Sequence, residues 1–277
     1  GRATAIAAAA LSAVAPAARA EPVAETSLTP TGAQIGESRL RDPRPVVRVV
    51  EVAPDGTRGT TVTVSDRSRA ARLVGGTQVK AGAVAVAFDQ QLGDGRWEPM
   101  LAYRPAGSTL FLPSVATGPA HRDTTAGHAD PVVLGPDGSG IVLGFGSTHR
   151  DTFVKRLSAD GTLGPAIVIA PRSIGSVLAR AEVSASGTVV IAIAARQAVD
   201  GLYDDEPAFA SSIYATTLPA GASRPTPLQH LSTSANPDDA LPSLAVVVDE
   251  DDYAVVEAGR FAPSRTESWA GPATDLR

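Results

Sequence analysis

The chain has 277 residues, of which 43% are hydrophobic and 19% charged, with 26 glycines and 22 prolines. This composition can bury a core, and it lacks both the glycine and proline excess of a low-complexity chain and the regular glycine period of collagen. The net charge of −5 and the absence of cysteine exclude a strongly basic nucleic-acid-binding surface, disulfide bonds and thiolate metal sites.

The first 20 residues have the features of a secretory signal. Arg2 supplies positive charge, residues 3–14 are mostly apolar, and residues 18–20 (ARA) have the small-x-small pattern of a cleavage site. No later apolar run reaches the roughly 18 residues that a membrane-spanning helix needs. We therefore expect a signal-peptide remnant at 1–20 and a secreted or extracytoplasmic protein. The alternative is an alanine-rich helix at the edge of the fold.

Residues 21–43 predict a linker or mobile arm, because they are rich in Pro, Thr, Ser and Glu and poor in large apolar residues. From Pro45 onward, short runs of Val, Ile and Leu alternate with Asp-Gly turns, which is the pattern of β-hairpins. The clearest stretch is 130–170, where four such runs follow one another. We expect one all-β domain over 44–277.

The hairpins recur with a loose period of about fifty residues. Residues 46–64 match 152–169, with Asp-Gly-Thr at the turn of each. Turn positions fall into two series, Gly56, Gly107, Gly161 and Gly221 in one and Gly95, Gly138, Gly187 and Asp252 in the other. Four strands per period predict a β-propeller, in which four-stranded antiparallel blades bury each other's faces. A β-sandwich is the alternative.

The strand pair from Pro131 to Phe145, and more weakly that from Pro242 to Ala258, follows the pattern P-x-V-x-V-x-x-D-G-x-x-V-V. This pattern resembles the repeat of secreted bacterial β-propeller-like proteins. The resemblance covers about 44–277, and it implies a scaffold and no particular activity. Tryptophan-aspartate dipeptides, kelch double glycines and the sialidase Asp-box are missing at the blade spacing.

The two ends of the repeat region each resemble half of a unit. Residues 45–64 correspond to a second half and residues 242–259 to a first half, so we expect them to complete one blade together. With three fuller units between them, the ring would have about four blades. The alternative is an incomplete ring, a fragment of a larger propeller.

Three His-x-Asp triplets stand in predicted loops, at 121–123, 128–130 and 149–151. Imidazole and carboxylate groups are usual ligands of zinc and other transition metals. The first two triplets are close together and predict a metal site. Its ligands would be His121, Asp123, His128 and Asp130. The alternative is that these are polar loop residues whose aspartates support turns.

Acidic clusters at 204–206, 238–239 and 249–252 offer the oxygen ligands that calcium requires, without the spacing of an EF-hand. Solvated turn residues are the alternative. A pair of carboxylates at suitable separation could also hydrolyse a glycosidic bond. No other cofactor is predicted.

No catalytic motif is present, neither a G-x-S-x-G elbow, nor a P-loop, nor a dinucleotide-binding G-x-G-x-x-G, so no catalytic residue is predicted. Five aromatic residues could stack on sugars or pack between blades, namely Trp97, Tyr103, Tyr214, Tyr253 and Trp269. The sequence thus predicts an exported, non-catalytic scaffold that binds a protein or a cell-envelope glycan through loops on one propeller face. The alternatives are an extracellular polysaccharide-acting enzyme, a hydrolase or lyase, and a fragment of a larger propeller.

Overall fold

The computed structural model describes residues 26–29, 32–38, 44–122, 131–145, 151–174, 176–199, 208–234, 243–249, 251–260 and 265–273. Within these ranges the regular elements are β-strands and one 3-10 turn, Arg172–Ile174. The predicted all-β class is confirmed. This part of the chain contains no helix with the length and hydrophobicity of a membrane span.

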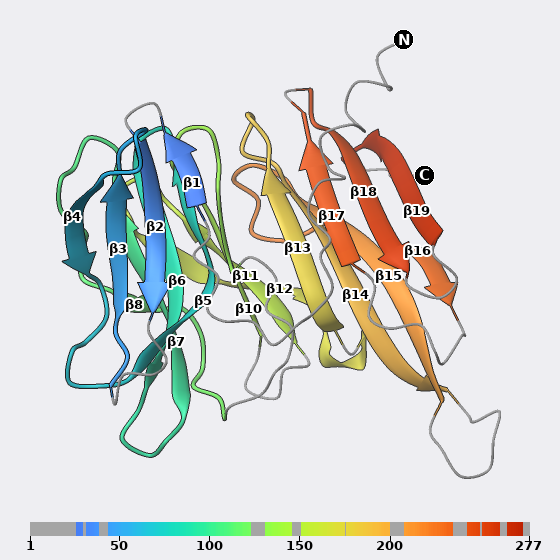
Figure 1. The fold of residues 1–277 in the computed structure, drawn as a ribbon. Coiled ribbons are helices and arrows are strands. Elements are labelled where there is room, and N and C mark those ends of the chain that lie inside the picture. The colour runs from blue at the N-terminus through green and yellow to red at the C-terminus, as the bar shows by residue number, and fades with distance from the viewer. Residues whose placement is uncertain are drawn as a thin grey trace.

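The described strands form five antiparallel sheets, in each of which consecutive strands are neighbours (Figure 1). Sheet I contains β1 (Thr26–Thr29), β2 (Gly32–Ser38), β3 (Val47–Val52) and β4 (Arg58–Thr63). Sheet II contains β5 (Ala71–Lys80), β6 (Ala83–Gln91), β7 (Trp97–Arg104) and β8 (Val115–Ala116). Sheet III contains β9 (Val132–Leu134), β10 (Gly140–Phe145), β11 (Thr152–Leu157) and β12 (Leu163–Ala170).

Sheets IV and V complete the described fold. Sheet IV contains β13 (Ser176–Val183), β14 (Val189–Val199), β15 (Ala208–Leu218) and β16 (Gln229–Ser234). Sheet V has three described strands, β17 (Ser243–Val248), β18 (Tyr253–Arg260) and β19 (Arg265–Pro272). The predicted repeat of four-stranded antiparallel blades is therefore confirmed.

Consecutive sheets pack face to face, as propeller blades do. A separate cluster of buried apolar side chains lies between each consecutive pair of sheets, from I and II to IV and V. The first strands lie at the junctions, where β5 contacts β1, β2 and β9, and β13 contacts β9 and β17. Sheets stacked around their first strands have the propeller-like arrangement that the repeats predict.

Strand β6 shows why the sheets stack in this way. Its side chains alternate between the two faces of sheet II, and both faces are buried. Val84, Val86 and Phe88 pack toward sheet I, whereas Ala85 and Ala87 belong to the cluster shared with sheet III. An almost continuous apolar run is the sequence of a strand covered on both sides.

Two expectations about the ends of the chain are wrong. Residues 26–29 and 32–38, which lie within the expected linker, are strands, and Gly36 pairs with Val49 in the ladder between β2 and β3. Backbone hydrogen bonds hold this segment in a sheet although its sequence lacks the apolar alternation of a half-buried strand. Sheet I is thus formed from its own strands and shares none with β17–β19, and the described sheets number five instead of about four.

The predicted turn positions are confirmed by the backbone. All eight have positive φ, namely Gly56, Gly95, Gly107, Gly138, Gly161, Gly187, Gly221 and Asp252. Six turns share one hydrogen-bond pattern, illustrated by Ser158 N–H donating to Thr162 O and Gly161 N–H donating to Ser158 O, both at 2.9 Å. Asp252 adopts a φ of 58° without being glycine, and its carboxylate accepts a hydrogen bond of 2.9 Å from Ser186 Oγ.

One grouping of these turns needs correction. Gly138, Gly187 and Asp252 each lie between the first and second strands of a sheet, whereas Gly95 lies between the second and third strands of sheet II. The matching position in sheet II is Gly82, between β5 and β6.

The antiparallel order gives the stack two distinct ends. Turns between first and second strands and between third and fourth strands lie at one end, which we call the tight-turn end. The other end, the connection end, carries the turn at 92–96 and the links between sheets, such as 64–70. Strands β1, β13 and β17 run in the same direction in Figure 1, so the ends of different sheets coincide.

Candidate active site between the second and third sheets

A buried carboxylate stands at the connection end of sheet II. Asp89 follows the apolar part of β6, and its side chain is only 2% exposed. Arg72, directly opposite on β5, donates from Nε and Nη2 to Asp89 Oδ2 at 3.2 and 3.0 Å. Because a buried charge is costly unless it is paired and hydrogen-bonded, this cross-strand arginine stabilises the ionised form of Asp89.

His121 supplies the second partner of this carboxylate. A bridge of two backbone hydrogen bonds, 2.7 and 2.8 Å, ties His121 to Trp97 at the start of β7. Its Nε2 lies 3.5 Å from Asp89 Oδ1, and its Nδ1 lies 3.1 Å from the carbonyl oxygen of Arg122. A carbonyl only accepts, so Nδ1 carries a proton, and a proton on Nε2 as well allows both nitrogens to face acceptors. The geometry therefore fits an imidazolium ion.

The titration behaviour of the pair agrees with this geometry. Burial acts to raise the pKa of Asp89, but hydrogen bonds and charge from His121 and Arg72 prevail, and the pKa is lowered. The hydrogen bond to Asp89 raises the pKa of His121 against the opposing effect of burial. Both shifts favour the charged forms, so the two groups stabilise each other as an ion pair.

Arg72 is itself held in place by an aromatic ring. Its guanidinium carbon lies 4.3 Å from the centroid of Trp97, within the range of a cation–π contact. Trp97 also carries the backbone bridge to His121. One residue thus orients both of the cations that face Asp89.

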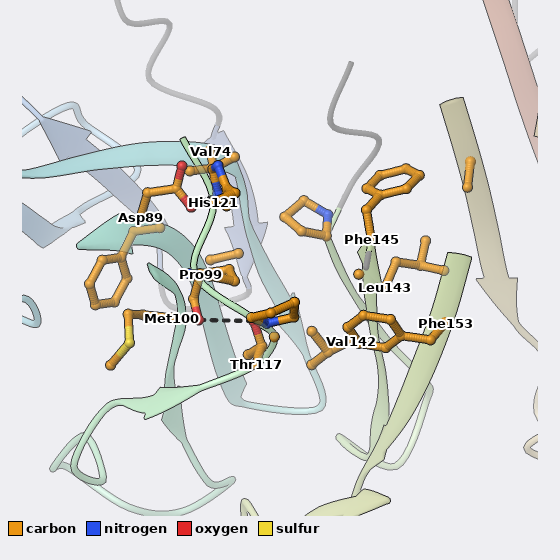
Figure 2. Close-up of a pocket in the computed structure, with 17 residues that line it drawn as sticks. Val74, Asp89, Pro99, Met100, Thr117, His121, Val142, Leu143, Phe145 and Phe153 are labelled. Carbon is orange, nitrogen blue, oxygen red and sulfur yellow. Dashed lines mark hydrogen bonds and ion pairs between the residues drawn. The ribbon is translucent and has the colours of Figure 1, made fainter. Parts of the chain in front are cut away.

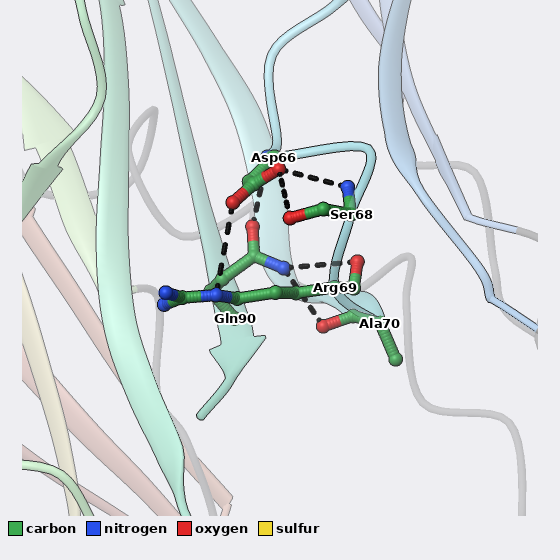
Figure 3. A network of polar contacts seen from close by, with 5 residues as sticks. All are labelled: Asp66, Ser68, Arg69, Ala70 and Gln90. Atoms are coloured by element: carbon green, nitrogen blue, oxygen red, sulfur yellow. Dashed lines mark hydrogen bonds and ion pairs between the residues drawn. The ribbon is translucent and has the colours of Figure 1, made fainter. Parts of the chain in front are cut away.

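A second polar network lies on the opposite face of β6, because the adjacent side chains of Asp89 and Gln90 alternate between faces. Figure 3 shows this network. The Oε1 atom of Gln90 accepts a hydrogen bond of 2.9 Å from Asp66 N–H, and its Nε2 donates to the carbonyls of Arg69 and Ala70 at 3.1 and 2.9 Å. These bonds fix the link between sheets I and II immediately before β5. Because Arg72 follows two residues after Ala70, Gln90 helps to set the position of that arginine.

The acid–base pair lines a pocket between sheets II and III (Figure 2). The pocket contains a cavity of about 50 Å³ that opens to solvent. Asp89 and His121 lie on the sheet II side, while Leu143, Phe145 and Phe153 face them from sheet III. A mostly apolar pocket with a few converging polar groups is the usual form of a small-molecule site. This arrangement can bind an organic group beside a proton donor or acceptor.

Of the four predicted metal ligands, only His121 lies among the described residues; Asp123, His128 and Asp130 fall outside them. Both ring nitrogens of His121 have protein partners, Asp89 and the Arg122 carbonyl. Within the described ranges, no group of three or more His, Asp or Glu side chains could hold a metal ion. The site formed by those four residues stays a prediction.

The acidic clusters are only partly described, since 204–206 and 238–239 fall outside the described ranges. In the third cluster, Asp249 Oδ1 accepts hydrogen bonds from the backbone N–H groups of Asp251 and Tyr253, at 3.0 and 2.8 Å. Asp252 accepts from Ser186 Oγ of sheet IV. These carboxylates support a turn and the contact between sheets IV and V, and calcium binding stays a prediction.

The aromatic residues do not form one platform, because they are spread over sheets II, IV and V. Tyr103 is 3% exposed, and its hydroxyl donates to the carbonyls of Gly138 and Ala159 at 2.8 and 3.1 Å. Trp269 packs against the apolar cluster between sheets IV and V. Both Tyr103 and Trp269 therefore fit the alternative interpretation, in which the aromatic residues pack between blades.

The sequence did not identify Arg72 or Asp89 as site residues. They are separated in the chain from each other and from His121, and no motif links them. One signal was present: β6 reads AVAVAFDQQ, so three polar residues end a strand that is otherwise apolar on both faces. A charged residue at a position where the strand is covered on both sides needs a partner, and it marks a functional candidate.

No protein-family model matches the chain, and no curated protein matches it in sequence. Among solved structures, it is similar to an exo-β-1,3-galactanase from Clostridium thermocellum, with 12% identity and a TM-score of 0.41 over 91% of this chain and 60% of that one. The chain thus spans about three fifths of that protein. The β-propeller domain of the Trilobed protease from Pyrococcus furiosus gives 9% identity and a TM-score of 0.40, over 91% and 69% of the two chains.

A GH43_1 enzyme from Xanthomonas citri gives 12% identity and a TM-score of 0.34, over 92% of this chain and 90% of that one. At these identities and TM-scores, the comparisons assign no role to any residue of the pocket. The prediction of a non-catalytic binding scaffold is nevertheless wrong. It depended on the absence of a catalytic set, whereas Asp89 and His121 converge on a pocket between sheets II and III.

Proposed function

We propose that the protein is an extracellular enzyme that acts on polysaccharide, with the pocket between sheets II and III as its reaction centre. The observation that carries this proposal is the Asp89–His121 ion pair, whose side chains are 2% and 6% exposed and line that pocket. A buried ion pair is weak support for stability, since apolar residues of similar volume would serve as well. Its position beside a pocket supports a chemical role.

The described groups fit elimination better than hydrolysis. Hydrolysis of a glycosidic bond uses two carboxyl groups about 5–10 Å apart. Asp89 is the one carboxylate among the described residues that line the pocket, and two cations already neutralise it. Elimination needs a single base, provided that the sugar carries a carboxyl group that acidifies the neighbouring C–H.

In this reaction, the neutral His121 ring turns its Nε2 away from Asp89 and accepts the proton from the carbon next to the carboxyl group of a uronic acid. The electron pair of that C–H bond forms a carbon–carbon double bond, and the bond to the leaving glycosidic oxygen breaks. The leaving oxygen then takes up a proton from water, and His121 returns its proton to the solvent. The products are an unsaturated uronic acid at one chain end and a new reducing end at the other.

The protonation state of His121 determines the expected pH dependence. The base must be neutral, and pairing with Asp89 raises the pKa of His121. The rate is therefore expected to rise with pH through that raised pKa. In Asp89→Asn, the imidazole loses its carboxylate partner, so the rising limb should move to lower pH.

The test uses two readouts on the same reactions. Polygalacturonate, alginate and hyaluronan serve as uronic-acid substrates, and xylan, arabinan and galactan as neutral ones. New reducing ends report any cleavage, whereas ultraviolet absorbance of the unsaturated product reports elimination alone. His121→Gln is expected to lower the elimination rate by at least about 100-fold.

A matched control is His230→Gln, since His230 lies on β16 of sheet IV and is exposed. This variant should keep wild-type activity. New reducing ends without ultraviolet absorbance would mean that the reaction is hydrolysis and not elimination. Cleavage of none of the six polysaccharides, or full activity in His121→Gln, would contradict the proposed reaction centre.

A further inference from the structure

We propose that the ring of Phe153, packed against Gly144, sets the size of the group that the pocket admits. The ligand class, the apolar face of a sugar ring, rests on the proposed function. The role of Phe153 in shaping the pocket rests on geometry alone. The wall that it forms lies opposite the acid–base pair (Figure 2).

The ring occupies space that the side chain of any other residue at position 144 would take. Gly144 on β10 and Phe153 on β11 are direct cross-strand partners. A Cβ atom built on Gly144 would lie 2.4 Å from Phe153 Cζ and 2.6 Å from Cε2. These distances are far below van der Waals contact, so even alanine at 144 would displace the ring.

A second glycine, from the neighbouring sheet, meets the same ring. A Cβ on Gly118, in the chain after β8, would lie 3.2 Å from Phe153 Cζ and 3.4 Å from Pro99 Cγ. The tip of the ring thus fits between glycines of sheets II and III, and both glycines line the pocket. A side chain at either position would alter the surface that a ligand meets.

The opposed walls suit a sugar ring. One face of a pyranose presents C–H groups that pack on an aromatic ring, while its hydroxyl and carboxyl groups need polar partners. Phe153 supplies the first surface, and Asp89 and His121 supply the second. Phe153 is 8% exposed, so a ligand would reach its ring only through the pocket.

Xenon is the probe that tests the shape of the pocket independently of any catalytic activity, because it enters small apolar cavities. Its affinity is measured by NMR in the wild-type protein and in Gly144→Ala. Displacement of the ring into the pocket is expected to lower that affinity about tenfold, equivalent to about 1.4 kcal/mol. Gly118→Ala, with its longer contacts, should have a smaller effect in the same direction.

Two further variants distinguish a change in the shape of the pocket from a general loss of stability. Gly164→Ala, on β12 of the same sheet, places its Cβ no closer than 3.6 Å to any neighbour and should bind xenon as the wild type does. Adding Phe153→Leu to Gly144→Ala removes the displaced ring and should restore xenon binding. Unchanged affinity in folded Gly144→Ala, or no recovery in the double variant, would overturn the proposal.

The second part of the experiment measures the kinetics of cleavage, with the polysaccharide that the wild type cleaves best. Gly144→Ala should raise KM more than it lowers kcat, because the acid–base pair on the opposite wall is untouched. If the xenon results hold while no polysaccharide is cleaved, the proposed function fails and the role of Phe153 stands. If cleavage occurs but Gly144→Ala leaves both xenon affinity and KM unchanged, the proposed function stands and the role of Phe153 fails.

Discussion

Two turn aspartates of the tight-turn end and the buried Asp89 of the connection end are bound in different ways. At the tight-turn end, Asp55 and Asp160 are exposed, and each accepts a hydrogen bond of 2.9 Å from the backbone N–H two residues on. At the connection end, Asp89 is buried and is bound by side chains from two other parts of the chain. All three carboxyl groups have a lowered pKa. A lowered pKa therefore does not by itself mark a site, whereas distant partners and burial do.

Removing the charge of the buried aspartate should have the largest effect. Asp89→Asn leaves Arg72 and His121 without their carboxylate, and the loss of one partner from a buried pair costs about 3–5 kcal/mol of unfolding free energy. Asp94→Asn is the matched control, because Asp94 binds only within its own exposed turn, to Arg96. Urea unfolding measures both. Equal destabilisation by the two variants would contradict the prediction that an aspartate with distant partners contributes more to stability than one bound within its own turn.

Alanine substitution of two turn glycines, one at each end, should have the next largest effect. Gly95 and Gly161 have similar φ values of 83° and 91°, so both variants incur backbone strain of about 1–2 kcal/mol. A Cβ on Gly95 meets nothing within 4 Å, whereas one on Gly161 would lie 2.4 Å from Leu112 Cδ1 and 2.9 Å from Tyr103 Cδ1. Gly161→Ala should therefore lose about 1–3 kcal/mol more than Gly95→Ala, as overpacking predicts. Thermal unfolding of both variants measures the difference, and equal melting temperatures would contradict it.

The free energy of unfolding should fall at alkaline pH, because His121 loses its proton and the ion pair with Asp89 is lost. The pKa of His121 is raised from an ordinary value of 6.5, so its contribution is complete below that pH and is lost as pH rises through the raised pKa. The contribution of Asp89 is present above pH 3.8 and is lost as pH falls through its lowered pKa. The stability difference between wild type and His121→Gln should therefore be largest between pH 3.8 and pH 6.5, and it should shrink as pH rises through the raised pKa of His121.

The local aspartates provide the internal comparison for this measurement. Asp55 and Asp160 have lowered pKa values, so they contribute only to the acid limb, and Asp160→Asn should leave the alkaline limb unchanged. Urea midpoints measured from about pH 4 to about pH 9 would give both limbs. An alkaline limb that persists in His121→Gln would assign it to another group.

The smallest effect is expected at the turn between β5 and β6. Ala81 and Gly82 both have positive φ, 49° and 84°, and they link paired Lys80 and Ala83. Asn-Gly is the preferred sequence for a two-residue turn of this kind. Ala81→Asn should raise the unfolding free energy by about 0.5–1 kcal/mol, and Ala81→Val should lower it. A loss of stability in Ala81→Asn would show that this turn differs from the others at the tight-turn end.

The parts of the fold that depend on neighbouring residues could be predicted from the sequence. Turn positions such as Gly161 can be predicted because Asp-Gly chemistry acts within a few residues, and Asp252 can be predicted from its place in the repeat. Strands β1 and β2 were missed, because their sequences, TSLT and GAQIGES, lack apolar alternation and only pairing with β3 places them in a sheet. The number of sheets was wrong for the same reason.

The acid–base site could not be predicted, since tertiary pairing creates it. The register between β5 and β6 brings Arg72 to Asp89, and the bridge from Trp97 brings His121. None of these relations has a fixed spacing in the sequence. His121 was singled out for its neighbours in the chain, whereas in the structure its described side-chain partner is Asp89.

The sequential order of strands in every sheet has a consequence for biosynthesis. Each sheet is built from one uninterrupted stretch of chain, so each can form as that stretch leaves the ribosome, beginning at the N-terminus. Arg72, Asp89 and His121 all precede sheet III, and the last phenylalanine of the opposite wall is Phe153. The walls that sheets II and III give to the pocket can therefore take shape before sheets IV and V exist, and Ala179 of β13 joins the lining afterwards.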